Sequence, residues 1–188
     1  MAIDTLMWFQ RYDGTYLDSE SQVDFSRDSQ SAAVHYPPNA NIFEVDDYSF
    51  EIAQTLNIGS HSSGTGAGKV TFNPFRITRK IDKASPVLFQ MACSGTAFQT
   101  VALVLRKSAG ASSSGVAFLK FTFKLVAVKT IAYAKSDESP KETVTFEYGG
   151  LVIEYWQQKP DGSMGTKVVD GWNRVKNILD SDVATVIK

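Results

Sequence analysis

Between Tyr48 and Ile58 the sequence alternates apolar and polar residues, and this pattern constrains the fold more than any other stretch. The even positions are Tyr48, Phe50, Ile52, Gln54, Leu56 and Ile58. The odd positions are Ser49, Glu51, Ala53, Thr55 and Asn57. In an extended strand, successive side chains point to opposite faces of a sheet. The pattern therefore predicts a long strand, which we place at Ile42–Ile58, in a sheet with one apolar and one polar face.

A glycine-rich stretch, Gly59–Gly68, separates this strand from a second one at Val70–Ile81. Pro74 predicts a bend or an edge position there. Further apolar or alternating runs predict strands at Ile3–Tyr12, around Val101–Leu105, over Val116–Tyr133 in one piece or two, over Val144–Tyr155, and through Val168 or Trp172. Within Val144–Tyr155, Gly149-Gly150 predicts a bulge.

Ser85-Pro86 predicts a helix start, with a capping serine followed by proline, and Gly95 predicts its end. This is the only convincing helix. Asp18–Asn41 is polar and contains Pro37-Pro38, so we interpret it as a long surface loop with at most a short strand at Val23–Phe25. The residues after about Asn177 are expected to form a tail or a short strand. The 188 residues thus predict one mainly β domain: an antiparallel β-barrel of two packed sheets with one short flanking α-helix and an extended glycine-rich loop.

The composition excludes several classes of protein. The formal net charge is −1, so no long-range positive field attracts nucleic acid or an anionic membrane. No apolar run approaches the roughly 20 residues of a membrane-spanning helix. Met1–Tyr12 has neither a basic segment nor a small-residue cleavage site, so we expect no cleaved signal peptide. The single cysteine, Cys93, excludes an intramolecular disulfide.

The residues also argue against an enzyme. The glycine-rich loop ends in Gly68-Lys69, but Ser63 and Val70 occupy positions where a phosphate-binding loop needs glycine and Ser or Thr. Cys93 is expected to be buried and inert. The two histidines, His35 and His61, lie in loops far apart, which predicts no metal site and no cofactor. The basic residues Arg76, Arg79, Lys80 and Lys83 are interpreted as solvated strand faces or interface ion pairs.

An ordered series of short motifs resembles one known family. The series begins with Gly64-Thr-Gly-Ala-Gly68-Lys69-Val70, Phe75, Ile81-Asp82-Lys83 and Ser85-Pro86. It continues with Met91-Ala-Cys93-Ser94-Gly95, Leu103-Val-Leu105-Arg106-Lys107, Tyr155, Gln158-Lys159, Asp161-Gly162 and Gly171-Trp172-Asn173. In this order and spacing, Tyr48–Asn173 resembles the Hcp (haemolysin-coregulated protein) family, the inner-tube proteins of bacterial type VI secretion.

The resemblance implies rings of six subunits that stack into a hollow tube. A contractile sheath expels such a tube, tipped by a VgrG-like spike, and the lumen carries or chaperones effector proteins. The chain would then be cytoplasmic during assembly and afterwards secreted without a cleaved signal peptide. The implied lumen-facing residues are Ser49, Glu51, Thr55 and Asn57. The implied ring-stacking loop contains Ser60, His61, Ser62, Ser63, Gly64, Thr65 and Gly66.

Other functions stay open at this point. A phage-type tail-tube protein would share the barrel. A stand-alone ligand- or carbohydrate-binding barrel would need aromatic residues clustered on one exposed face, for which Trp8, Trp156 and Trp172 are the candidates. A hydrolase that uses Cys93 is a third, more distant alternative.

Overall fold

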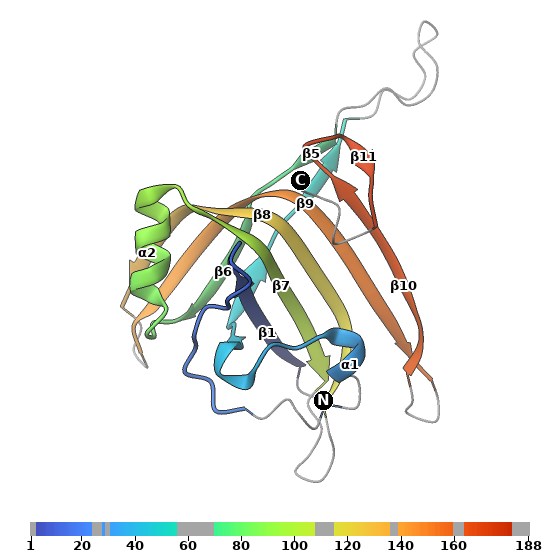
Figure 1. The fold of residues 1–188 in the computed structure, drawn as a ribbon, viewed down its shortest axis with the longest axis horizontal. Coiled ribbons are helices and arrows are strands. Elements are labelled where there is room, and N and C mark those ends of the chain that lie inside the picture. The colour runs from blue at the N-terminus through green and yellow to red at the C-terminus, as the bar shows by residue number, and fades with distance from the viewer. Residues whose placement is uncertain are drawn as a thin grey trace, which may run out of the picture.

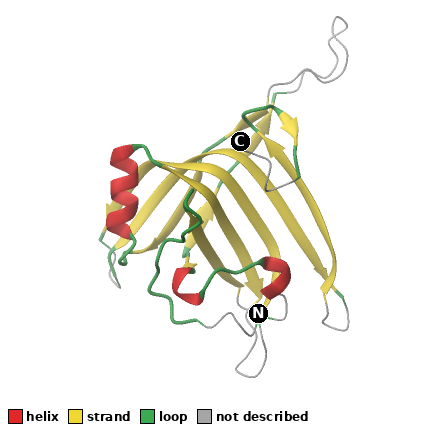
Figure 2. Ribbon diagram, in the orientation of Figure 1, coloured by secondary structure: helices red, strands yellow, loops and turns green. Residues whose placement is uncertain are grey.

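Antiparallel strands build most of the molecule (Figures 1 and 2), which is described here by a computed structural model. The structure describes residues 3–23, 28, 31–55, 70–107, 115–135, 139–159 and 164–181. The strands are β1 (Ile3–Gln10), β2 (Phe43–Glu44), β3 (Asp47–Ser49), β4 (Ile52–Gln54), β5 (Val70–Phe72), β6 (Phe75–Lys80), β7 (Ala97–Lys107), β8 (Val116–Ala134), β9 (Lys141–Gln158), β10 (Met164–Asn173) and β11 (Ile178–Leu179). The helices are α1 (Ser31–Val34), the 3-10 helix η1 (Asn39–Asn41) and α2 (Ser85–Ser94). A mainly β, antiparallel, barrel-like fold is therefore confirmed.

The main sheet follows the order β11-β10-β9-β8-β7-β1-β2, and β6 also pairs with β9. One short segment, 43–49, spans the seam of the barrel. Its first part, β2, pairs with β1, and the Val45 N–H donates to the Thr5 carbonyl over 3.0 Å. Its second part, β3, pairs with β6, and the Asp46 N–H donates to the Thr78 carbonyl over 2.9 Å. The sheet can therefore wrap around a core because this segment changes partners between Val45 and Asp46.

This change of partner explains why the predicted long strand Ile42–Ile58 is wrong. The backbone forms three short strands instead: β2 pairs with β1, β3 with β6, and β4 with β5. The predicted facing holds for Tyr48 and Phe50, which pack against the core, but not for Ile52, which is exposed. Leu56 and Ile58 lie outside the described residues.

Strands β8 and β9 both bend sharply at the same point along their length, at Leu125 and Gly149. Leu125 has a φ of 49°, in the left-handed region. By the pairing of Lys124 with Gly150 and of Val126 with Tyr148, it lies opposite Gly149. A side chain on Gly149 would lie 3.1 Å from the Leu125 Cβ, so glycine leaves room for the corner. Before the corner the odd-numbered residues Phe121 and Phe123 of β8 face the core, and after it the even-numbered residues Val126 and Val128 do.

The predicted bulge at Gly149-Gly150 is wrong in its position. The register of β8 and β9 is unchanged through these glycines, because both strands turn there together. The irregularity in register lies instead between Val128 and Thr130 of β8.

Two apolar clusters lie on the two faces of the bent sheet. The inner cluster is rich in aromatic rings, among which Phe75 stacks on Phe123 with ring centroids 4.3 Å apart. The outer cluster contains Leu6, Trp8, Val104 and Trp156, and the segment containing Tyr16, α1 and Ile42 covers it. The predicted surface loop Asp18–Asn41 therefore contributes α1, η1 and part of a second core. Val23 is not in a strand, and Asp24 and Phe25 lie outside the described residues.

Helix α2 packs beside β8 through its buried residues Leu88 and Met91. Its end at Gly95, where φ is 69°, is as predicted. The predicted serine cap is wrong, because Ser85 is already the first helical residue. The N-cap residue is Ala84, whose N–H donates to Asp82 Oδ1 over 2.8 Å. Cys93 was predicted to be buried, and this is wrong, because it is exposed on α2.

The predicted last strand and the strand-like end of the chain are present as β10 and β11. Within the described parts of the chain, no helix is both long and apolar enough to cross a bilayer.

Candidate functional site

A polar surface runs across four neighbouring strands, and we call it the polar face. Ser49 of β3 pairs with Arg76 of β6, Arg76 with Thr145 of β9, and Thr145 with Thr130 of β8. Ser49, Arg76 and Thr130 are exposed, and Thr145 is half-buried. The alternate residues of the same strands point into the inner cluster. The strict alternation of a pleated sheet thus places this whole row toward solvent.

A second polar row lies next to the first. Asp47 of β3 pairs with Thr78 of β6, which pairs with Thr143 of β9. The hydroxyl oxygens of Thr78 and Thr143 are 3.2 Å apart and share a hydrogen bond. Cross-strand threonine pairs of this kind stabilise a sheet without presenting a charge or an apolar group to solvent.

Ion pairs at the border of the polar face are formed within the subunit. Lys129 Nζ lies 2.8 Å from Glu147 Oε1, and Lys141 Nζ lies 3.0 Å from Asp46 Oδ2. All four side chains are partly or well exposed, so each pair adds little stability. Within each pair the two opposite charges offset each other locally, and the polar face combines hydroxyl groups with the exposed charged side chains of Arg76 and Asp47.

The structure brings together only part of the site predicted from sequence. Ser49 lies on the polar face, and Glu51 and Thr55 are exposed further along the same segment. Glu51 Oε2 accepts a hydrogen bond from Asn73 Nδ2 over 2.8 Å, which ties the two sides of the hairpin together. Asn57 and the loop Ser60–Gly66 lie outside the described residues.

Sequence reasoning missed Arg76, Thr145 and Thr130 as members of this surface. They are distant from Ser49 in the chain and meet it only through strand pairing. The alternation of threonines with Val144 and Phe146 was the available signal for the β9 part.

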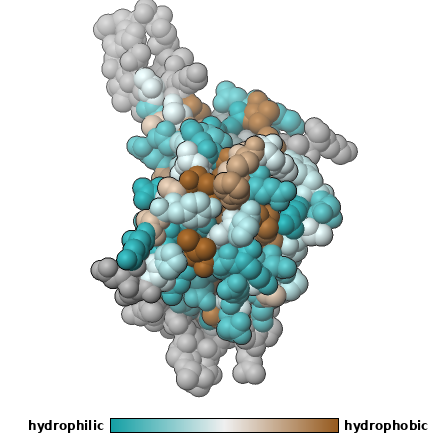
Figure 3. Space-filling view, turned by 90° about the vertical axis from the view of Figure 1, so that its left-hand side faces the viewer, coloured by the Kyte–Doolittle hydropathy of each residue, from teal (hydrophilic) through white to brown (hydrophobic). Residues whose placement is uncertain are grey.

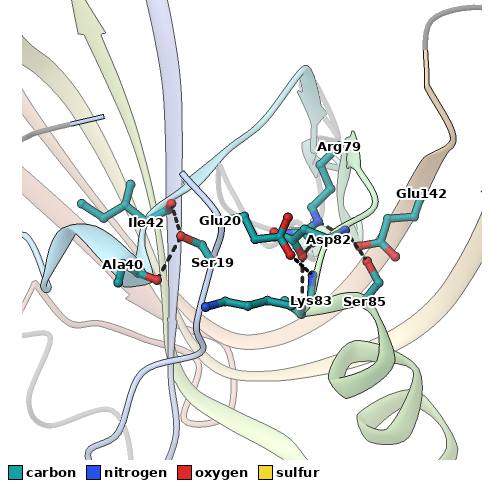
Figure 4. A network of polar contacts seen from close by, with 10 residues as sticks. Ser19, Glu20, Ala40, Ile42, Arg79, Asp82, Lys83, Ser85 and Glu142 are labelled. Atoms are coloured by element: carbon teal, nitrogen blue, oxygen red, sulfur yellow. Dashed lines mark hydrogen bonds and ion pairs between the residues drawn. The ribbon is translucent and has the colours of Figure 1, made fainter. Parts of the chain in front are cut away.

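Arg79 was predicted to be solvated or at an interface, and this is wrong, because its side chain is 2% exposed. Figure 4 shows it beside Glu142 and Asp82, and its Nε donates to Glu142 Oε1 over 2.8 Å. Its guanidinium carbon also lies 4.7 Å from the centroid of the Phe43 ring. Asp82 Oδ1 in turn accepts a hydrogen bond from the N–H of Ala84, the N-cap residue of α2, and the Lys83 N–H donates to Glu20 Oε1 over 3.1 Å. This network joins β6, β9, α2 and the segment before α1, so we assign it a structural role.

A second group of charged side chains, Lys120, Glu154 and Lys167, lies beside α1, which is part of the segment that covers the outer cluster. Lys120 is 9% exposed, and its Nζ donates to the Val34 carbonyl over 2.9 Å and lies 3.3 Å from Glu154 Oε2. Burial lowers the pKa of Lys120. Burial also disfavours ionised Glu154, but the hydrogen bond from Lys167 and the charge of Lys120 outweigh it and lower the pKa of Glu154. These charges therefore fasten α1 to the sheet.

The three tryptophans do not form an exposed aromatic surface. Trp8 and Trp156 are each 4% exposed within the outer cluster, and Trp172 is half-buried in β10. The described residues therefore lack the aromatic platform that a carbohydrate-binding barrel would need from these side chains.

Comparison with known proteins agrees with the fold and with the motif series. Residues 34–155 match the family described as "Type VI secretion system effector, Hcp". Protein hcp1 of Pseudomonas aeruginosa is 33% identical over 113 residues, which are 58% of this chain and 68% of that protein. A solved "Structure of a type six secretion system protein" is 25% identical with a TM-score of 0.74, covering 95% of this chain and 100% of the other. The crystal structure of Hcp1 from Salmonella typhimurium is 25% identical with a TM-score of 0.69, covering 96% of this chain and 100% of that one. The resemblance inferred from the sequence is confirmed, and the chain belongs to the Hcp family of type VI secretion system proteins.

Proposed function

We propose that this protein is the ring-forming subunit of a type VI secretion tube and that its polar face lines the lumen. The observation that carries this proposal is the row Ser49–Arg76–Thr145–Thr130, a polar surface four strands wide on the outside of an apolar core. Six copies arranged with this face inward would form a wet channel from strand faces alone. Family membership supports the further proposal that a VgrG-like spike, a contractile sheath and secreted effectors are its partners.

The chemistry of the polar face suits transport of diverse cargo. Hydroxyl groups exchange hydrogen bonds with water and with cargo at little net cost, because a typical hydrogen bond contributes only about 0.5–1.5 kcal/mol. The neighbouring charges Lys129 and Glu147 are already paired with each other. The lumen would therefore hold an effector weakly at many points and still release it.

The loop Ser60–Gly66 remains our proposal for contacts between stacked rings. It connects β4 and β5, which form one end of the hairpin that also carries Ser49. A loop in this position would extend the lumen wall toward the next ring. Deleting Ser62–Gly66 should leave rings intact and weaken stacking, and unchanged stacking would assign that contact to another element.

The first test is the mass of the purified protein in solution, together with negative-stain electron microscopy. We expect uniform rings of six subunits with an open centre. A monomer without rings at every concentration would refute the proposed function and would favour a stand-alone binding module.

The lumen assignment needs a separate test. Ser49→Arg should leave the fold and the ring unchanged, because Ser49 is exposed, and should reduce the amount of effector that co-purifies with the ring. Gln22→Arg, at an exposed position away from the polar face, is the matched control. Equal effector retention in both variants would place the lumen on another surface.

A further inference from the structure

The hairpin formed by β4 and β5 stands apart from the main sheet. Its two strands pair with each other and, among the described strands, with no other. On the β4 side its base is anchored by Phe50, whose ring packs edge to face against Phe75 and Phe123 of the inner cluster. A hairpin held at one point would still turn about that point. A second contact is therefore needed to fix the direction in which it leaves the barrel.

Arg174, in the turn between β10 and β11, makes such a contact on the β5 side. Its guanidinium carbon lies 5.2 Å from the centroid of the Phe72 ring of β5 and 4.7 Å from that of the Tyr148 ring of β9. These two rings meet edge to face with their centroids 6.3 Å apart. A guanidinium over an aromatic ring is attracted more strongly when it is shielded from water, and the Arg174 side chain is only 24% exposed. Figure 1 shows β5 beside β11 at the top of the barrel.

Hydrogen bonds to β9 hold Arg174 in this position. Its guanidinium donates to the Tyr148 carbonyl, and its backbone N–H donates to the Gly149 carbonyl over 2.9 Å. Glu147 Oε2 lies 3.6 Å from its Nη1. The planar guanidinium of arginine can stack on a ring and donate hydrogen bonds in its own plane at the same time, which the ammonium of lysine cannot do.

The turn that carries Arg174 is itself fixed. Asn173 is fully buried, and its Oδ1 accepts hydrogen bonds from the N–H groups of Val175 and Lys176 over 3.1 and 3.0 Å. Asn177 ends the turn with a φ of 56°, a left-handed conformation that asparagine tolerates better than most residues. The guanidinium is therefore presented to the hairpin from a well-defined support.

Tyr148 extends the connection to both strands of the hairpin. Its side chain is buried, and its hydroxyl donates to the Asn73 carbonyl over 3.2 Å. Burial raises the pKa of Tyr148 to about 12, so the hydroxyl keeps its proton at neutral pH. Asn73 follows β5, and its N–H and Nδ2 donate to the carbonyl and Oε2 of Glu51, which precedes β4, over 2.9 and 2.8 Å.

We propose that Arg174 sets the direction in which the β4–β5 hairpin leaves the barrel, by holding Phe72 against Tyr148. The consequence for assembly rests on the proposed function, in which the loop Ser60–Gly66 at the end of this hairpin contacts the next ring. A change of angle at the base of a hairpin displaces its tip most. Arg174 is thus a positioning residue that acts on ring stacking through the hairpin.

The direction of the hairpin is measurable as a distance between two spin labels. One label occupies Cys93, the single cysteine, which is exposed on α2, on the flank that faces the viewer in Figure 3. The other occupies Thr71→Cys, at an exposed position of β5. Pulsed electron paramagnetic resonance on labelled subunits diluted with unlabelled ones then gives the distance distribution within one subunit.

Arg174→Met keeps most of the apolar stem of the side chain and removes the guanidinium. We expect the width of the distance distribution to at least double, with an unchanged circular dichroism spectrum. Arg174→Lys keeps the charge over the rings and should give an intermediate width. Lys176→Met removes a positive charge from an exposed side chain of the same turn and is the matched control, which should leave the width unchanged. Tyr148→Phe removes only the hydroxyl and should broaden the distribution less than Arg174→Met.

Electron microscopy of the same variants separates this inference from the proposed function. Arg174→Met should form rings of unchanged mass that stack into shorter tubes than those of Lys176→Met. Unchanged widths in both Arg174→Met and Tyr148→Phe would overturn the inference, whether or not rings form. A broader distribution in a protein that never forms rings would support the role of Arg174 and refute the proposed function. A broader distribution with normal stacking would likewise support that role and assign the ring contact to another element.

Discussion

Replacing Glu154 by glutamine should destabilise the subunit far more than replacing its partner Lys120 by methionine. Glu154→Gln removes the carboxylate that pairs with Lys120, whose ammonium lies 3.3 Å away and is nearly buried. A buried charge left without its partner costs about 3–5 kcal/mol. The remaining hydrogen bond to the Val34 carbonyl offsets part of this, so we expect a loss of about 3 kcal/mol.

Lys120→Met acts on the same pair from the other side and should cost less. Glu154 keeps its 2.6 Å contact with Lys167, whose side chain is 42% exposed. Methionine fills the volume beside Trp8 without the desolvation cost that lowers the pKa of Lys120. We expect a loss of about 1 kcal/mol, mainly from the Val34 carbonyl that loses its donor. The double variant should be more stable than Glu154→Gln alone.

Urea unfolding at pH 7, followed by tryptophan fluorescence, measures these free energies. Repeating the measurement at lower pH tests the direction in which the stability contribution of Glu154 changes. The pKa of Glu154 is lowered in the folded state, so its ionised form contributes stability above the ordinary value of 4.5 that is lost as pH falls through the folded pKa. The difference between the unmodified protein and Glu154→Gln should therefore shrink below pH 4.5. Equal losses for Lys120→Met and Glu154→Gln would refute the reasoning that desolvation decides this pair.

Three further substitutions test the packing and the corners of the sheet. Phe75→Ala should lower the unfolding free energy by about 3–5 kcal/mol in the same assay, because it empties a fully buried site stacked on Phe123; a loss below about 1 kcal/mol would show that the aromatic core can collapse around it. Gly171→Ala would place a Cβ 2.4 Å from the Asp180 carbonyl oxygen, so β11 should detach, and hydrogen exchange at Asp180 should accelerate at least tenfold. Unchanged exchange there would mean that the backbone shifts to admit the methyl group. Leu103→Asp should abolish soluble expression, since it buries an unpaired charge in the inner cluster, whereas a soluble, folded variant would contradict the assigned facing of β7.

Local patterns in the sequence predicted the elements that local physics controls. Apolar or alternating runs identified β1, β7, β8 and β9, and Gly95 marked the end of α2 because few other residues adopt its left-handed conformation. The segment 42–58 was misjudged because alternation reports which face a residue occupies, not which strand it pairs with. Pairing there is divided among β1, β6 and β5.

The same distinction separates the predicted part of the polar face from the missed part. Ser49 was found from its own strand, whereas Arg76, Thr145 and Thr130 join it through contacts between strands distant in sequence. Arg79 was misjudged for a related reason. Asp82 lies only three residues away, but the other partner, Glu142, is 63 residues away, so the sequence near Arg79 shows only part of the charge compensation inside the barrel.

The seam at 43–49 has a mechanical consequence. Because Val45 is bonded to Thr5 of one wall and Asp46 to Thr78 of the other, a single peptide unit links β1 to β6. A pull on the hairpin that carries β6 is thereby transmitted through that peptide unit into β1. Strand-to-strand hydrogen bonds on both sides of it would have to be sheared before the barrel could open. A subunit under mechanical load would thus depend, for its resistance to being pulled apart, on the backbone N–H groups of two consecutive residues, Val45 and Asp46.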